Sequence, residues 1–179
     1  MEKQQRSGLY LFEALELRGE YDSRIVTIKN CLVKGSNVSK RGLLWGDSHI
    51  KHRPSKDFDV SDERARLRTL EFKRRKLNSA IQKANYETQI EFDGQTMNLL
   101  EALDVRKAMK NQLAELNEQV EASAFQTVIY KEDRDIIDGS EISYKESRDA
   151  LDACRCMFRE LNRKLRIASF ETQVGFEDE

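Results

Sequence analysis

Hydrophobic residues recur every three or four positions through four long stretches of the chain. This spacing places them along one face of an α-helix, because about 3.6 residues make one helical turn. It predicts helices at residues 9–33, 60–87, 98–121 and 144–170. In the first helix, the face that we expect to be buried consists of Leu11, Leu15, Arg18, Tyr21, Ile25, Ile28 and Leu32.

Polar residues mark the starts of three of these helices. Asn98 and Ser143 are each followed three residues later by a glutamate, which is the pattern of a capping box. In that motif the side-chain oxygen accepts a free helix N–H, and the carboxylate reaches back to the backbone of the capping residue. Asp59 is expected to cap the helix at 60–87 in the same way.

The sequence contains two related copies of one unit. The segment LFEALELR at 11–18 recurs as LLEALDVR at 99–106, with an offset of 88 residues. The segment ANYETQIEF at 84–92 recurs as ASFETQVGF at 168–176, with an offset of 84 residues. Because the matched positions also share the helical spacing, we interpret the two copies as an internal duplication.

The predicted fold is mainly α. Each copy forms a long α-hairpin, so that two tandem hairpins from an internal duplication make a four-helix arrangement. The first helical-hairpin repeat is placed at 9–92 and the second at 97–176, both packed as one domain. Residues 1–8 are expected to form a disordered N-terminus.

Short β elements are expected at the hairpin tips, 34–58 and 122–142, which are long for connections within a helical bundle. In the second tip, Thr127–Tyr130 is β-branched and aromatic, as strands often are, and Leu43–Trp45 is the apolar run of the first tip. Extended chain is also expected after two of the helices, at 87–92 and 171–176, with a turn at Asp93 and Gly94.

Polar residues that recur in both copies include Arg18 and Arg106, Asn78 and Asn162, and Glu13 and Glu101. Both arginines fall within an apolar face, where a guanidinium needs hydrogen-bond partners. Antiparallel helices would bring each arginine close to the asparagine of its own copy. Two interpretations stay open at this point: an anion or ligand site that is formed twice, or internal pairs that fix the helix register.

The apolar faces are narrow, in places about two residues in seven, which is nearer to a coiled-coil seam than to a globular helix face. Long helices with such a seam leave apolar edges uncovered, among them Phe12, Phe72 and Phe125. This pattern favours a homo-oligomer, and hence a non-enzymatic, self-associating helical scaffold or interaction protein.

Three helical segments resemble the septicolysin-like family of uncharacterised bacterial proteins. They are LLEALDVR at 99–106, the pattern Asn78-x-x-Ile81-x-x-x-Asn85-x-x-Thr88, and the run Arg159-Glu160-Leu161-Asn162-x-x-Leu165. The resemblance covers most of the predicted helices and implies a helical fold. It is weakest in the first tip, where the family usually carries an acidic stretch and this chain has a basic one.

Positive charge is concentrated in one part of the chain. Residues 34–86 hold 14 Lys and Arg against 6 Asp and Glu, although the whole chain has a net charge of −1. Such a segment can bind phosphates, and Trp45 could stack on a base. Nucleic-acid or polyanion binding is therefore the alternative function. Its candidate residues are Lys51, Arg53, Lys56, Arg64, Arg68, Arg75 and Lys76.

Other classes of function find little support in the sequence. It has no apolar run of about 18 residues, so we expect no membrane-spanning segment. Asp47, His49, His52 and Asp57 lack the spacing of a zinc site, and neither a Gly-rich phosphate loop nor a hydrolase motif occurs. We therefore expect no catalytic residues, metal or cofactor. The three cysteines do not suit a disulfide framework, which favours a cytoplasmic protein, with Cys31 expected in the core.

Overall fold

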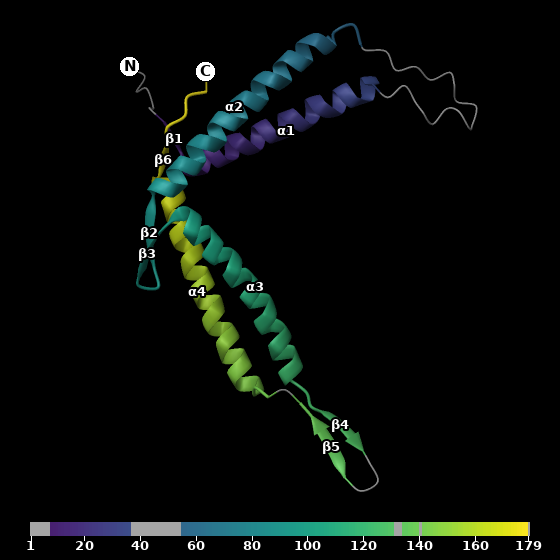
Figure 1. Ribbon diagram of the computed structural model, residues 1–179, viewed down its shortest axis with the longest axis vertical. Helices are drawn as coiled ribbons and strands as arrows, with labels where there is room; N and C mark the ends of the chain where they lie inside the picture. The colour runs from purple at the N-terminus through teal and green to yellow at the C-terminus, as the bar shows by residue number, and fades with distance from the viewer. Residues whose placement is uncertain (1–7, 37–54, 131–133, 140, 179) are drawn as a thin grey trace, which may run out of the picture. The chain divides into compact units, whose positions relative to one another are not determined.

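The computed structural model describes residues 8–36, 55–130, 134–139 and 141–178. Four long helices account for most of these residues, and short antiparallel strand pairs account for much of the rest (Figure 1). The predicted mainly α fold class, with four helices and short β elements, is confirmed. The helices are α1 (Leu11–Ser36), α2 (Val60–Glu87), α3 (Leu99–Ser123) and α4 (Tyr144–Glu171).

The helix starts follow the predicted capping residues. In α3 the Glu101 N–H donates to Asn98 Oδ1 at 2.9 Å, and the Asn98 N–H donates to Glu101 Oε2 at 2.9 Å. Ser143 and Glu146 make the same reciprocal pair at the start of α4, at 3.3 and 3.2 Å. Asp59 Oδ1 accepts the Ser61 N–H at 2.6 Å before α2. All three caps are confirmed, and they satisfy N–H groups that have no partner inside a helix.

Three antiparallel strand pairs lie at the helix ends. Strand β1 (Leu9–Tyr10) pairs with β6 (Gln173–Val174), and β2 (Gln89–Phe92) pairs with β3 (Gln95–Asn98). Strand β4 (Thr127–Tyr130) pairs with β5 (Asp135–Asp138), which confirms the predicted strand of the second tip.

The turn between β2 and β3 was also predicted from the sequence. Asp93 and Gly94 both have positive φ, at 51° and 71°. These values suit a two-residue hairpin turn of type I′, in which Asp-Gly is a favoured pair. The expected strand at Leu43–Trp45 and most of the expected disordered N-terminus, residues 1–7, lie outside the described residues.

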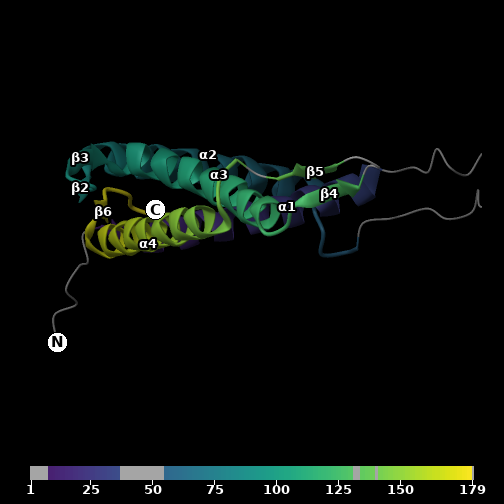
Figure 2. The ribbon, with the colours of Figure 1, turned by 90° about the horizontal axis from the view of Figure 1, so that it is seen from below.

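The first compact unit combines α1, most of α2, β1 and β6, from residues 1–84 and 171–179. Its two helices run antiparallel. Residues early in α1 contact residues late in α2, and residues late in α1 contact residues early in α2. Lys29 pairs with Glu71 at 2.7 Å and Asp22 with Arg74 at 2.7 Å. Figure 1 shows α1 and α2 side by side, and Figure 2 gives a second view of the ribbon. The unit's fully buried large side chains are Tyr21, Leu77, Ile81 and Val174.

The second compact unit, residues 85–170, combines α3, α4 and the strands β2 to β5. Its core consists of Phe92, Ala102, Met109 and Leu161, with Ile90, Met97, Val105, Phe158 and Leu165 packed against it. Polar contacts join the helices to each other and to β2. Arg155 Nη2 donates to Asn117 Oδ1 at 3.1 Å, and Lys164 Nζ donates to the Glu91 carbonyl at 2.5 Å.

The two units use the same contacts at their strand ends. With offsets of 88 and 84 residues, the Leu9–Val174 pair of the first unit corresponds to the Met97–Ile90 pair of the second. The Leu11 N–H donates to the Thr172 carbonyl at 2.8 Å, and at the corresponding position the Leu99 N–H donates to the Thr88 carbonyl at 3.1 Å. Each unit thus contains a strand that the sequence repeat assigns to the other copy.

Three expectations about burial were wrong. Leu15 is 37% exposed, because its neighbour Ala14, which is fully buried, lies nearer the centre of the buried face. Arg106 is exposed and not part of an apolar interior, since its long side chain reaches solvent from the edge of the helix face. Cys31 is also exposed, because it lies between the buried positions of its helix.

Candidate functional site

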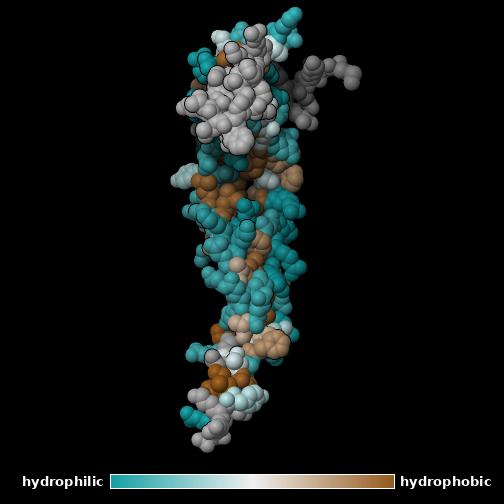
Figure 3. All heavy atoms as spheres, turned by 90° about the vertical axis from the view of Figure 1, so that its right-hand side faces the viewer, coloured by the Kyte–Doolittle hydropathy of each residue, from teal (hydrophilic) through white to brown (hydrophobic). Residues whose placement is uncertain are grey.

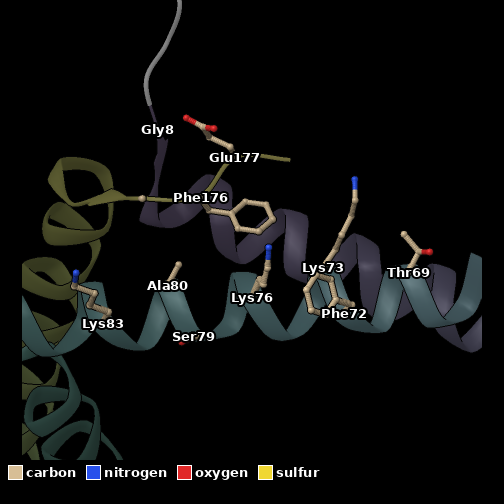
Figure 4. Close-up of a pocket in the computed structure, with 11 residues that line it drawn as sticks. Gly8, Thr69, Phe72, Lys73, Lys76, Ser79, Ala80, Lys83, Phe176 and Glu177 are labelled. Carbon is tan, nitrogen blue, oxygen red and sulfur yellow. The ribbon is translucent and has the colours of Figure 1, made fainter. Parts of the chain in front are cut away.

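A groove lies along α2 in the first unit, beneath the chain segment that follows β6. It encloses about 1040 Å³. Its wall combines aromatic rings with amines, and Figure 4 shows both groups facing the same space. The residues that give the groove its chemistry are Phe72, Lys73, Lys76, Lys83, Phe176 and Glu177. We call it the C-terminal groove.

The helical side of the C-terminal groove is one continuous face of α2. Lys73, Lys76, Ala80 and Lys83 line it, three or four residues apart, so their side chains leave the helix in one direction. Phe72 belongs to the same face and is 50% exposed. The Lys76 Nζ lies 4.8 Å from the centre of the Phe72 ring, which is a cation–π contact. The face thus presents an aromatic surface with a positive charge beside it.

The other side of the groove is the C-terminal tail, residues 175–178. Val174 is fully buried and anchors the tail, while Phe176 is half-buried and extends toward the lysines of α2 (Figure 4). Asp178 Oδ1 accepts hydrogen bonds from Tyr21 Oη at 2.5 Å and from Lys73 Nζ at 2.9 Å. These bonds fix the far end of the tail against both helices of the unit.

The Tyr21–Asp178 contact changes the acidity of both groups. Burial of the Tyr21 phenol, together with its hydrogen bond to Asp178, raises the pKa of Tyr21 above its usual range. The hydrogen bond from Tyr21, followed by that from Lys73, lowers the pKa of the Asp178 carboxyl. Around neutral pH the carboxylate is therefore ionised and the phenol keeps its proton.

The structure separates the basic residues that the sequence grouped together. Lys51 and Arg53 lie outside the described residues. Lys56, Arg64, Arg68 and Arg75 are exposed and do not line the groove, whereas Lys76 does. Sequence reasoning did not select Lys73, Lys83 or Phe176 as site residues. The lysines and Phe72 follow a spacing of three or four residues, and this spacing indicated that they share a face of the helix. No pattern in the nearby sequence indicated that the tail would lie over that face.

The recurring polar pairs have different surroundings in the two units. Arg18 Nη1 lies 3.5 Å from Asn78 Oδ1, so α1 and α2 do bring this pair together. Arg106 and Asn162 line a smaller cavity of about 540 Å³ beside Lys107 and Lys110. In that cavity the Asn162 amide donates to the Phe158 carbonyl at 2.8 Å, one turn earlier in α4.

Glu13 and Glu101 act at helix starts. Each carboxylate accepts a backbone N–H three residues before it, from Tyr10 and Asn98 respectively, both at 2.9 Å. These bonds account for the recurrence of the two glutamates, because each satisfies a free backbone donor near the start of its helix. This geometry favours the structural interpretation for this pair.

A second surface feature is the hairpin of β4 and β5 in the second unit. Opposite residues share a face, so Val128 and Ile137 lie on one face and Ile129 and Ile136 on the other. Ile137 is 63% exposed and Ile129 49%. Tyr130 and the preceding Phe125 are exposed as well, and Figure 3 shows hydrophobic atoms gathered over this hairpin.

Among the described residues, no group of three or more His, Cys, Asp or Glu side chains is close enough to hold a metal ion. Asp47, His49 and His52 lie outside those residues, and Asp57 is exposed. Cys31, Cys154 and Cys156 are free thiols. Over the same ranges, no helix has the length and apolar content needed to cross a bilayer.

Comparison with known proteins gives a structural relative. No family model matches the chain, and no curated protein matches it significantly. Among solved structures, it is similar to the crystal structure of a functionally unknown conserved protein from Corynebacterium diphtheriae. The two superpose with a TM-score of 0.67 at 18% sequence identity, over 93% of this chain and 99% of the other. At this level of identity, the likeness shows that the two proteins share a fold.

Proposed function

We propose that this chain is a non-enzymatic, self-associating helical scaffold or interaction protein, and that copies associate through the β4–β5 hairpin. The observation that carries the proposal is the exposure of apolar residues on both faces of this hairpin. In a strand pair with one solvent-exposed face, apolar and polar residues normally alternate along each strand. Apolar residues on both faces are instead typical of strands that are covered on both sides.

The edges of the hairpin support the same proposal. A two-stranded hairpin is at most marginally stable by itself in water, and three or more strands or a packed helix are usually needed. Its outer edges also carry backbone N–H and C=O groups that can pair with another strand. Within the described residues, β4 and β5 pair only with each other.

A second copy of the chain is the occupant that this geometry fits. An antiparallel strand edge is complementary to its own copy when the two are related by a two-fold axis. Such pairing would extend two strands to four, and apolar side chains of the two hairpins would then be neighbours across the new strand pair. Contacts between apolar side chains across the new strand pair, Ile137 among them, would contribute about 0.2–1 kcal/mol for each pair.

The test is the solution mass of the full chain. Wild-type protein is expected to show a multiple of 20.9 kDa by light scattering across a concentration series. Ile137→Lys places a charge on one hairpin face and should shift the mass to that of the monomer. Val26→Lys, on an exposed part of α1, is the matched control and should leave the mass unchanged. A monomeric wild type, or an Ile137→Lys oligomer of unchanged mass, would contradict the proposal.

We also infer that the two halves of the chain derive from an internal duplication and that they are related to the septicolysin-like family. The matched strand pairs and the matched capping glutamates support the duplication, because they lie at the offsets found in the sequence. The helical segments quoted above support the family relationship. As part of the same proposal, we expect the two repeats to pack together as one domain.

Polyanion or nucleic-acid binding through residues 34–86 is the second candidate function. One observation favours it: three lysines of α2 line a single groove together with an exposed aromatic ring. Binding of nucleic acid should then weaken steeply with salt, because neutralised phosphates release counterions. Retardation of a nucleic acid in gels at low and high ionic strength measures this. Equal retardation in both conditions, or none at low salt, would exclude it.

A further inference from the structure

We infer that the C-terminal groove binds a nucleotide unit, with the base against the phenylalanine rings and the phosphate against the lysine amines. The inference rests on the second candidate function and names its site and its ligand. A nucleotide is the chemistry in question, whether it is a free mononucleotide or one residue of a single strand.

The aromatic part of the groove suits a flat base. Phe72 comes from α2 and Phe176 from the tail, so the rings of two separate elements line the same space (Figure 4). Phe72 remains half exposed, so the part of its ring that the Lys76 amine does not cover is available for stacking. Every base has a π-face, and stacking on an aromatic side chain is worth about 1–3 kcal/mol per base. The volume, about 1040 Å³, is large enough for a nucleotide.

The lysines place positive charge where a phosphate would follow the base. Lys73, Lys76 and Lys83 line the groove. Glu177 also lines it and contributes an acidic side chain. Lys73 already donates to Asp178. Lys76 pairs with no carboxylate in the part of the chain that the structure describes, and its amine lies over the Phe72 ring. Lys76 is therefore the residue that we assign to the phosphate.

The second unit shows that packing does not require these residues. With the offset of 84 residues, the positions of Phe72, Lys73 and Lys76 correspond to Cys156, Met157 and Glu160 of α4. Leu77 and Leu161, which correspond to each other by the same offset, are both fully buried. The helices thus agree in the core and differ on this face. The combination of Phe72, Lys73 and Lys76 is therefore absent from the corresponding positions of α4.

The experiment measures binding of a fluorescein-labelled oligothymidylate to the full chain by fluorescence anisotropy at low salt. Phe72→Ala should raise Kd about tenfold through the loss of stacking. Lys76→Ala should also weaken binding, and should reduce the slope of log Kd against log salt by about 0.7, the value for one phosphate of a single strand. The matched controls are Phe170→Ala and Arg163→Ala on α4, which should leave Kd unchanged. Circular dichroism confirms that each variant is folded.

Competitors identify the source of the ligand. Displacement by thymidine monophosphate would assign the groove to free nucleotides, and displacement by unlabelled oligonucleotide alone would assign it to a single strand. Both outcomes support the inference. Displacement by inorganic phosphate at the same concentration would overturn the role of the base. Oligonucleotide binding that Phe72→Ala and Lys76→Ala leave unchanged would overturn the groove assignment while keeping polyanion binding. Absence of binding at low salt would overturn both.

Discussion

Leu77→Ala and Leu161→Ala are each expected to lower the free energy of unfolding by about 2–5 kcal/mol. Both side chains are fully buried, one in the core of each unit. Truncation removes apolar contacts and leaves a cavity that long, capped helices cannot easily close. Because a protein of this kind is stable by about 5–15 kcal/mol, each loss would be a large fraction of the total. Urea denaturation followed by the helical circular dichroism measures it.

Leu15→Ala is the matched control for this prediction. It makes the same chemical change at a position that is 37% exposed, where solvent already covers part of the side chain. Its cost should therefore be about 1–2 kcal/mol, smaller than the loss at the fully buried leucines. If Leu161→Ala were as mild as Leu15→Ala, the interior of the second unit would not be centred on Leu161.

Tyr21→Ala is expected to cost about 3–5 kcal/mol, the usual range for loss of a buried aromatic side chain. The ring is almost completely buried between α1 and α2, and its hydroxyl is the contact through which Asp178 holds the tail. The substitution therefore removes core packing and releases one end of the C-terminal groove. Thermal unfolding of the variant beside the wild type measures the loss.

Tyr21→Phe separates the hydroxyl from the ring and should cost about 1 kcal/mol near neutral pH. The difference from wild type should depend on pH at both ends. The pKa of Asp178 is lowered in the folded protein, so its contribution is present above the ordinary carboxyl pKa and disappears as the pH falls through the folded value. The pKa of Tyr21 is raised, so its contribution decreases above about pH 10. A difference that stayed constant from acid to alkali would contradict this account.

The helices could be predicted from the sequence because their determinants are local. The bounds of α2 agree with the prediction at both ends, and the Asn98 and Ser143 caps lie where the spacing of a glutamate indicated them. The strand at Thr127–Tyr130 followed from its β-branched residues, and the turn at Asp93 and Gly94 followed from the conformations that these residues prefer.

The pairing of β1 with β6 depends on contacts that no local pattern contains. Leu9 and Val174 are far apart along the chain, and each strand has only two residues, too few to show an alternation. The tail of the groove was missed for the same reason. Residues with helical spacing could be assigned to a face, but the degree of burial at Leu15 or Arg106 depends on how closely the neighbouring helix approaches.

The pairing of β1 with β6 also means that two strands far apart in the sequence are neighbours in the structure. The first and last strands of the described chain are neighbours, and they meet as β3 and β2 do around the turn at Asp93 and Gly94. One junction is covalent and the other is made by hydrogen bonds alone. The connectivity is therefore close to that of a ring that has been opened at one of two equivalent joints. A circular permutant in which a linker joined β6 to β1, and whose chain began at Gly94, is expected to retain every strand pair described.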